Sequence, residues 1–177
     1  HEDIPIVILV HDIQSQYYPE FFTHEELFHL EKHLRQSCAV ADRLVCISEF
    51  TRQTLLEKMQ VYPDQLVTIH NSLINLIEPV DAEEARAHLA KYALTGGEYL
   101  FYPANYWAHK NHLMLLTAFN LYRRRNPQSR LKLVIPGSPG GRKELLEQSV
   151  IQMGLDEWVV MPGFVSKGEF NALARGS

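Results

Sequence analysis

Residues 99–119, YLFYPANYWAHKNHLMLLTAF, decide the fold of the second half of the chain. The apolar run at their start is typical of a buried strand. A proline and a polar loop, Asn105–Asn111, then interrupt the apolar pattern. After the loop, Leu113, Leu116 and Phe119 recur at the spacing of one helical face. The segment therefore predicts a strand, a polar loop and an amphipathic helix in that order.

The polar loop has the composition of an anion-binding site. Lys110 stands where the helix is expected to begin, and the first backbone N–H groups of a helix lack partners within it. The helix dipole is positive at the same end, so negative charge is stabilised there. Asn105, His109, Asn111 and His112 add hydrogen-bonding groups. The alternative is an ordinary strand-to-helix loop with a solvated lysine.

The same alternation of strand and helix runs through the whole chain. Strands that alternate with helices indicate an α/β fold with parallel sheets flanked by helices. The first of these strands is a continuous β-branched run, which predicts burial on both faces. The further predicted strands, besides the one that opens residues 99–119, are Ile4–Val10, Leu44–Ile47, Leu66–Ile69, Leu131–Ile135 and Val159–Met161.

Helix ends can be located from capping residues. Thr23 with Glu26, and Ser166 with Glu169, have the spacing of a capping box at the start of a helix. The first of these helices is expected to bury an inner stripe of leucines that includes Leu30. Ser48 and Asp81 are also expected as N-caps. Gly154 has the position of a glycine that closes a helix.

Composition excludes several classes of function. The formal net charge of −4 argues against a sequence-independent nucleic-acid binder, which is usually basic. No apolar run approaches the roughly 20 residues that span a bilayer. Cys38 and Cys46 have no metal or redox spacing, which favours reduced thiols in a cytoplasmic protein. The chain begins at His1, so the lack of a visible signal peptide carries no weight.

A metal site is not expected, although the chain has nine histidines. His29 and His33 lie one turn apart, but leucine follows His29, where a zinc protease has glutamate. His109 and His112 flank Lys110, which would repel a cation. No DxD motif occurs to hold a divalent ion against a diphosphate. Cationic side chains and helix N-termini would therefore balance a bound diphosphate.

The Gly-rich segment Pro136–Lys143, PGSPGGRK, leads into another predicted helix. It is neither a P-loop nor a dinucleotide fingerprint. Its backbone could approach a phosphate closely, and a structural turn is the alternative.

Six motifs are informative together: HDIQ (11–14), ADRLVCISEFT (41–51), VTIHNS (67–72), YPANYWAHKNHLMLLTAF (102–119), VIPG (134–137) and VVMPGFVSKGEFNAL (159–173). They resemble one known family, the group 1 (GT4-type) retaining glycosyltransferases, and among them mannosyltransferase-like members of surface polysaccharide assembly. The similarity covers nearly the whole chain in the family's order. It implies the GT-B architecture, in which two Rossmann-like domains face each other across a cleft. Residues 1–76 would be the latter half of the N-terminal acceptor domain, and residues 77–177 the first half of the C-terminal donor domain.

The resemblance also implies site residues. His11 matches the catalytic histidine that lies beside the transferred sugar in the family. Lys110 matches the lysine that binds the donor diphosphate. Asn105 stands where an arginine usually assists that lysine, and Gly137 matches the glycine after the second strand of the donor domain.

A nucleobase contact is implied for the backbone near Phe164 and Val165. The family's acidic signature, which binds the sugar hydroxyls and the ribose, is expected after the helix that begins near Ser166. The chain ends at Ser177 before reaching it. The expectation is therefore a fragment of a larger enzyme, inactive by itself.

The activity implied for the full protein is metal-independent hexosyl transfer with retention, and no cofactor is expected. The donor would be a nucleoside diphosphate sugar, with GDP-mannose favoured, and the acceptor a glycan. The expected location is cytoplasmic, with peripheral association at the inner face of the cell membrane through the missing part. Two alternatives are a non-catalytic nucleotide-sugar or glycan-binding module and an enzyme that resembles nucleoside diphosphate sugar epimerases.

Overall fold

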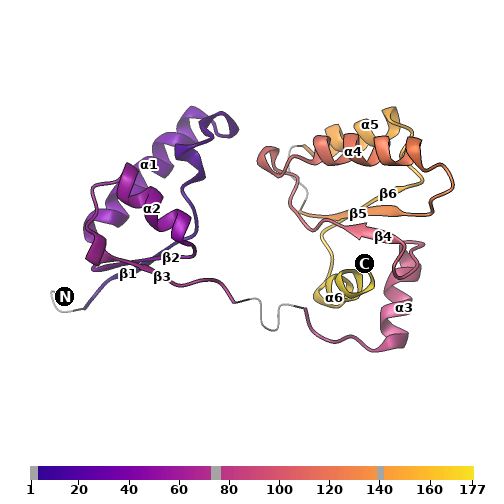
Figure 1. The fold of residues 1–177 in the computed structure, drawn as a ribbon, viewed down its shortest axis with the longest axis horizontal. Coiled ribbons are helices and arrows are strands. Elements are labelled where there is room, and N and C mark those ends of the chain that lie inside the picture. The colour runs from indigo at the N-terminus through magenta and orange to yellow at the C-terminus, as the bar shows by residue number, and fades with distance from the viewer. Residues whose placement is uncertain (1–3, 73–76, 139–141) are drawn as a thin grey trace. The chain divides into compact units, whose positions relative to one another are not determined.

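The computed structural model of the protein describes residues 4–72, 77–138 and 142–177. The chain divides into two compact units, His1–Leu73 and Ile74–Ser177. The boundary expected between residues 76 and 77 adjoins residues 73–76, which lie outside the described part. Each unit is an α/β structure with its own parallel sheet, as the alternating pattern predicts (Figure 1).

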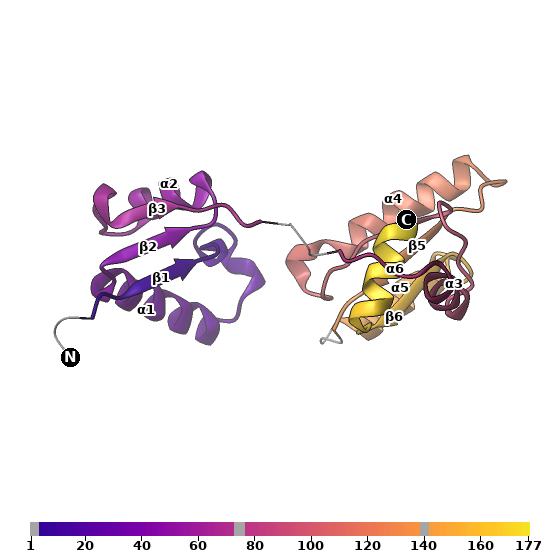
Figure 2. The ribbon, with the colours of Figure 1, turned by 90° about the horizontal axis from the view of Figure 1, so that it is seen from below.

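The first unit contains a three-stranded parallel sheet in the order β1-β2-β3. Ile8 pairs with Leu44, and Leu44 with Leu66, across the three strands. Both helices lie on one face of the sheet (Figures 1 and 2). The elements are β1 (Val7–Val10), α1 (His24–Val40), β2 (Arg43–Cys46), α2 (Glu49–Lys58) and β3 (Leu66–Thr68), with short 3-10 helices at Gln14–Gln16, Pro19–Phe21 and Pro63–Gln65.

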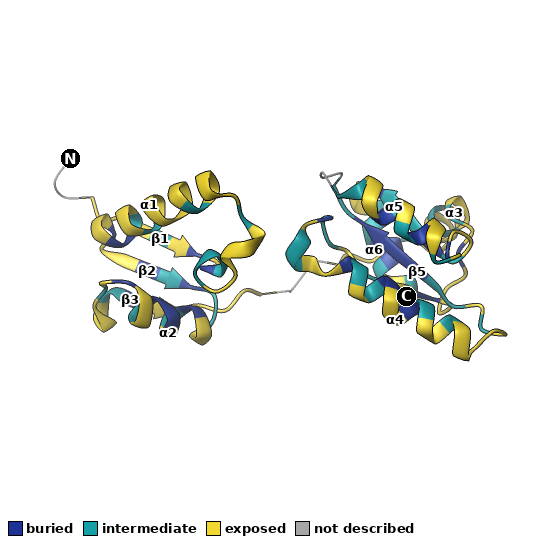
Figure 3. Ribbon diagram, turned by 90° about the horizontal axis from the view of Figure 1, so that it is seen from above, coloured by how far each residue is buried: buried dark blue, intermediate teal, exposed yellow. Residues whose placement is uncertain are grey.

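The prediction that residues 4–10 are buried on both faces is wrong. Val10 is buried, but Val7 and Leu9 are 61% and 49% exposed. Leu9 is in register with Val45 and Val67, so these three side chains lie on one face. Among the described residues, α1 and α2 cover only the opposite face (Figures 1 and 2), and Figure 3 colours part of β1 as exposed.

The second unit also has a three-stranded parallel sheet, in the order β4-β5-β6, but helices cover both of its faces. One core cluster includes Leu116 and Leu146 from α4 and α5. A second cluster includes Leu173 from α6, with Leu89 from α3 packed against it. The elements are α3 (Ala82–Lys91), β4 (Tyr99–Phe101), α4 (His112–Arg125), β5 (Lys132–Pro136), α5 (Lys143–Gln152), β6 (Val159–Gly163) and α6 (Lys167–Gly176).

Capping was predicted more accurately than burial. Capping boxes open α1 at Thr23 and α6 at Ser166, and the side chains of Ser48 and Asp81 cap α2 and α3. Gly154 follows α5 with a φ of 66°. Leu30, expected on the inner stripe of α1, is instead 43% exposed. Leu100 is 48% exposed because β4 is an edge strand of the described sheet.

Candidate functional site

The carboxyl ends of β4, β5 and β6 meet at one edge of the second sheet, where ligands bind in open parallel sheets. A 3-10 turn, Ala108–Lys110, follows β4. Asn111 then adopts the left-handed conformation, with φ 52° and ψ 41°, before α4 begins at His112. Lys110 is exposed on the turn that precedes the helix, and α4 begins one residue after the expected start at Asn111.

Asn105 and Gly137 hold two strand ends together. The side-chain oxygen of Asn105 accepts a hydrogen bond from the backbone N–H of Ser138 at 2.9 Å. A Cβ atom on Gly137 would lie 2.4 Å from the backbone oxygen of Ala104, so only glycine fits there. Gly137 also donates its N–H to the Gly163 carbonyl at 2.9 Å. These contacts give both residues a structural role at the edge where phosphate binding is expected.

Phe164 and Val165 follow β6 and differ sharply in exposure. Gly163 has a φ of 78°, which turns the chain at the end of the strand. Phe164 is 80% exposed, whereas Val165 packs against the core cluster around Leu173. Of the two, Phe164 presents its ring to solvent, where a planar group could stack on it.

His11 lies in the first unit, immediately after β1. Its side chain is exposed, and its carbonyl accepts a hydrogen bond from the Thr51 hydroxyl at 3.4 Å. The neighbouring Asp12 carboxylate accepts from the backbone N–H of Gln14 at 3.1 Å, which fixes the loop after the strand. The other expected site residues lie in the second unit.

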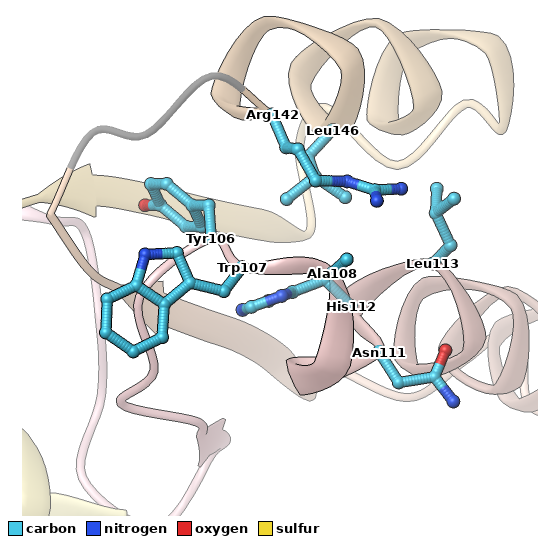
Figure 4. Close-up of a pocket in the computed structure, with 8 residues that line it drawn as sticks. All are labelled: Tyr106, Trp107, Ala108, Asn111, His112, Leu113, Arg142 and Leu146. Atoms are coloured by element: carbon cyan, nitrogen blue, oxygen red, sulfur yellow. The ribbon is translucent and has the colours of Figure 1, made fainter. Parts of the chain in front are cut away.

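A small pocket lies between the beginnings of α4 and α5, with a volume of about 40 Å³. Tyr106, Trp107 and His112 form one side of it, and Arg142 and Leu146 the other (Figure 4). Arg142 is the residue immediately before α5. This pocket is a feature that the sequence did not predict.

His112 is the unusual residue of this pocket. It is 3% exposed, and its Nε2 atom has no hydrogen-bond partner. Its ring makes edge contacts with the rings of Tyr102 and Tyr106, at centroid distances of 5.4 and 5.6 Å. Burial lowers the pKa of His112, and the nearby charges of Arg142 and Lys110 act in the same direction. A hydrogen bond to the backbone of Ala104 opposes them.

The sequence did contain a signal for the burial of His112. This residue lies four positions before Leu116 and seven before Phe119, and these three are the buried residues of α4. The expected stripe began instead at Leu113, which is only half-buried. Arg142 had no comparable signal, because its place beside His112 depends on the packing of α5 against α4.

In residues 4–72, 77–138 and 142–177, no group of three or more His, Cys, Asp or Glu side chains is placed to hold a metal ion. The helices of the same residues include none that is both long and apolar enough to cross a membrane.

The first unit is similar to a known family by sequence. Residues 1–73 match the model of Glycosyltransferase Family 4. Over 159 residues the chain is 26% identical to the O-antigen chain mannosyltransferase B of Escherichia coli. That alignment covers 90% of this chain and 42% of the relative.

The similarity to solved structures includes residues of both units. Anabaena HepE, in complex with UDP and glucose, matches 96% of this chain with a TM-score of 0.72 and 16% identity. The sucrose-phosphate synthase of Thermosynechococcus elongatus matches 97% with a TM-score of 0.68 and 17% identity. The chain spans 44% and 42% of their respective lengths, less than half of each. These neighbours are GT-B glycosyltransferases, and this chain has their α/β fold, with two parallel sheets flanked by helices.

Proposed function

We propose that this protein transfers a hexosyl group from a nucleoside diphosphate sugar to a glycan acceptor. The observation that carries the proposal is the edge of the second sheet, where Lys110 precedes the N-terminus of α4. A cation beside a helix N-terminus is suited to a diphosphate. The similarity of the first unit to Glycosyltransferase Family 4 and the UDP bound by Anabaena HepE support this reading.

The expected site residues have distinct roles in this proposal. Lys110 binds the donor diphosphate and stabilises the charge that develops on it as the sugar leaves. Gly137 and Asn105 keep the backbone of the β5 loop close to the β4 loop, so the diphosphate meets a fixed surface. Phe164 and the backbone of Val165 contact the nucleobase. His11 contacts the transferred sugar and is the catalytic candidate of the first unit.

The finer assignment is retaining mannosyl transfer in surface polysaccharide synthesis, with GDP-mannose as the favoured donor. The Escherichia coli relative is named as a mannosyltransferase of the O-antigen chain, which favours mannose. Anabaena HepE was solved with UDP-glucose, which favours the other nucleotide. Melting-temperature shifts with GDP, UDP and ADP separate the two, because a ligand that binds the native state stabilises it.

The central test is sugar transfer by the full-length enzyme that carries Lys110→Ala. Loss of one charged group at the developing negative charge should lower the transfer rate by roughly tens to thousands of fold. Lys32→Ala, which removes the same charge from the exposed surface of α1, should transfer at the wild-type rate. Equal rates for the two variants would contradict the role of Lys110.

The products separate this proposal from its alternatives. A transferase forms a new glycosidic bond, and the anomeric configuration of the product, read by NMR, tests retention. Formation of an epimer of the donor sugar would favour the epimerase alternative. Donor binding with neither product would favour a non-catalytic binding module.

A further inference from the structure

The pocket between α4 and α5 lies beside the N-termini of two helices. α4 has 14 residues and α5 has 10, and neither is capped by the side chain of the residue before it. In the described part of the chain, the side chains of Thr23, Ser48, Asp81 and Ser166 cap the other four α-helices. The two helix ends without such a cap therefore meet at the same pocket, where both dipoles favour negative charge.

His112 provides an independent indication of a missing partner. A buried nitrogen without a hydrogen bond costs free energy, and nearly all buried polar groups in folded proteins have partners. Nε2 of His112 has none, although the residue is 3% exposed and lines the pocket. In Figure 4 its ring extends from the start of α4 towards Tyr106 and Trp107, below Arg142. Trp107, on the same wall, is 55% exposed.

The tautomer of His112 follows from its other hydrogen bond. The ring bonds to the backbone of Ala104, whose N–H is already donated to the Pro136 carbonyl at 3.1 Å. The bond from the imidazole must therefore go to the Ala104 carbonyl, which only accepts. Since Nε2 lacks a partner, Nδ1 carries the donated proton. In the neutral ring Nε2 is then a bare acceptor, and it becomes a donor only when the ring is protonated.

We propose that this pocket binds a phosphate group of the nucleoside diphosphate, with His112 and Arg142 as its positioning residues. The inference rests on the proposed function, because the phosphate is that of the donor. Two helix N-termini and the Arg142 guanidinium all favour an anion over a neutral hydroxyl group. Arg142 also supplies a second cation besides Lys110 for a ligand that carries more than one negative charge.

Phosphate binding at this pocket should be coupled to protonation of His112. Without ligand, burial and the charges of Arg142 and Lys110 keep the ring neutral. The rings of Tyr102 and Tyr106 also contact it, and burial raises the pKa of the Tyr106 hydroxyl. A bound phosphate places negative charge beside Nε2, and this charge raises the pKa of His112, so that the protonated ring is favoured. The ring then takes up a proton from solvent and donates it in a hydrogen bond to a phosphate oxygen.

NMR of the histidine rings tests the coupling in the wild-type protein, with pyrophosphate as the probe. Without pyrophosphate, the His112 signals should titrate below the ordinary histidine pKa. At saturating pyrophosphate, their midpoint should move upwards. The signals of His88 on α3, which packs on the opposite face of the sheet, should not respond. An unchanged His112 titration while pyrophosphate binds would overturn the proposal, and this result depends on no variant.

Affinity measured against pH gives a second readout. Pyrophosphate binding by the wild type should strengthen on acidification more steeply than binding by His112→Gln, by up to about tenfold per pH unit for one proton. The comparison removes the ionisation of pyrophosphate itself, which is common to both proteins. His88→Gln is the matched control and should keep the wild-type slope. Parallel slopes for wild type and His112→Gln would refute the coupling.

Two substitutions test Arg142: one removes the charge of its side chain, and the other keeps the charge but changes the shape of the charged group. Arg142→Gln should weaken pyrophosphate binding about tenfold or more, the scale of a hydrogen bond to a charged group. Arg142→Lys should recover part of the loss, since a lysine keeps the charge without the planar fork. Arg124→Gln near the end of α4 removes the same charge and should bind as wild type does. Equal affinities for the two glutamine variants would exclude Arg142 from the site.

Further ligands separate this inference from the proposed function. Binding of orthophosphate as tight as that of UDP or GDP would mean a general phosphate site and would overturn the assignment to the donor. Tight nucleotide binding with no effect at His112 or Arg142 would overturn the inference and leave the proposed function standing. If neither UDP nor GDP binds, the proposed function itself fails.

Discussion

Glu169 shows how a single charged residue can anchor an element of this fold. Its carboxylate accepts hydrogen bonds from Lys91 and from the Tyr92 hydroxyl, at 2.5 and 2.8 Å. It also accepts from the backbone N–H of Ser166 at 2.9 Å and so closes the capping box of α6. The bond from Lys91, followed by that from Ser166, lowers the pKa of Glu169 to about 2. One buried carboxylate thus joins α6 to the end of α3.

Glu169→Gln should destabilise the second unit by about 2 kcal/mol at pH 7, a value reduced for the partial exposure of Lys91. The folded-state pKa lies below the ordinary value of 4.5, so the stabilisation is fully present above pH 4.5. It is lost as the pH falls from about 4.5 to about 2. Urea unfolding at pH 7 and at pH 3 should therefore show a smaller difference between the two proteins at pH 3. A difference independent of pH, or an equal loss in the exposed control Glu157→Gln, would contradict this account.

Residue by residue, the sequence predicts local interactions better than long-range ones. The capping boxes were predicted because both partners lie within three positions of each other. The partners of Glu169 at the end of α3, Lys91 and Tyr92, are more than 70 positions away, and no local pattern points to them. Asn105 is similar: its residue type suggested a neutral replacement for a cation, but its bond to Ser138 depends on how two loops pack. The roles of Lys110 and His11 in binding remain predictions.

At the scale of the element, Gly137 sets how closely the loop after β5 approaches the loop after β4. A methyl group there would meet backbone atoms of Ala104 and Asn105, which cannot rotate away as a side chain can. Gly137→Ala should therefore destabilise the second unit by about 1–3 kcal/mol, the usual cost of overpacking. It should also weaken nucleotide binding, because the strand ends must move apart.

A second glycine provides the control for this prediction. A methyl group on Gly96 would lie 3.7 Å from the nearest atom, the Gly176 carbonyl oxygen, at an ordinary contact distance. Gly96→Ala should change the midpoint of thermal unfolding little. Equal melting temperatures for the two alanine variants would show that the loops at Gly137 adjust freely, against the expectation from the structure.

The sequence predicted where strands form, but not which of their residues are buried. The apolar run at residues 4–10 does form a strand, because β-branched residues favour extended backbone. Its burial depends on what covers each face, and α1 and α2 cover only one. The pattern of apolar residues along a strand does not show whether a distant segment covers a face or whether that face is exposed to solvent. The apolar face of Leu9, Val45 and Val67 could therefore be found only in three dimensions.

At the scale of the whole molecule, the sequence predicts two α/β units from the order of its elements. The core clusters agree with this division, since each draws all its residues from a single unit. The assignment of the units to acceptor and donor halves remains a prediction, because it concerns ligands. The pocket at His112 was not predicted, because two helices from distant parts of the second unit form it.

Because each unit has its own core, a substitution in one core should destabilise that unit and leave the other unit unchanged. Leu55 is fully buried in the cluster of the first unit, and Leu133 is 1% exposed in a cluster of the second. Leu55→Ala should cost about 2–5 kcal/mol and lower the hydrogen-exchange protection of β1, β2 and β3. The amides of β4, β5 and β6 should keep their wild-type protection. Leu133→Ala should give the reverse pattern, so each variant is the control for the other. Loss of protection in both sheets from either substitution would mean that the chain unfolds as one cooperative unit, and the division into two independent cores would be wrong.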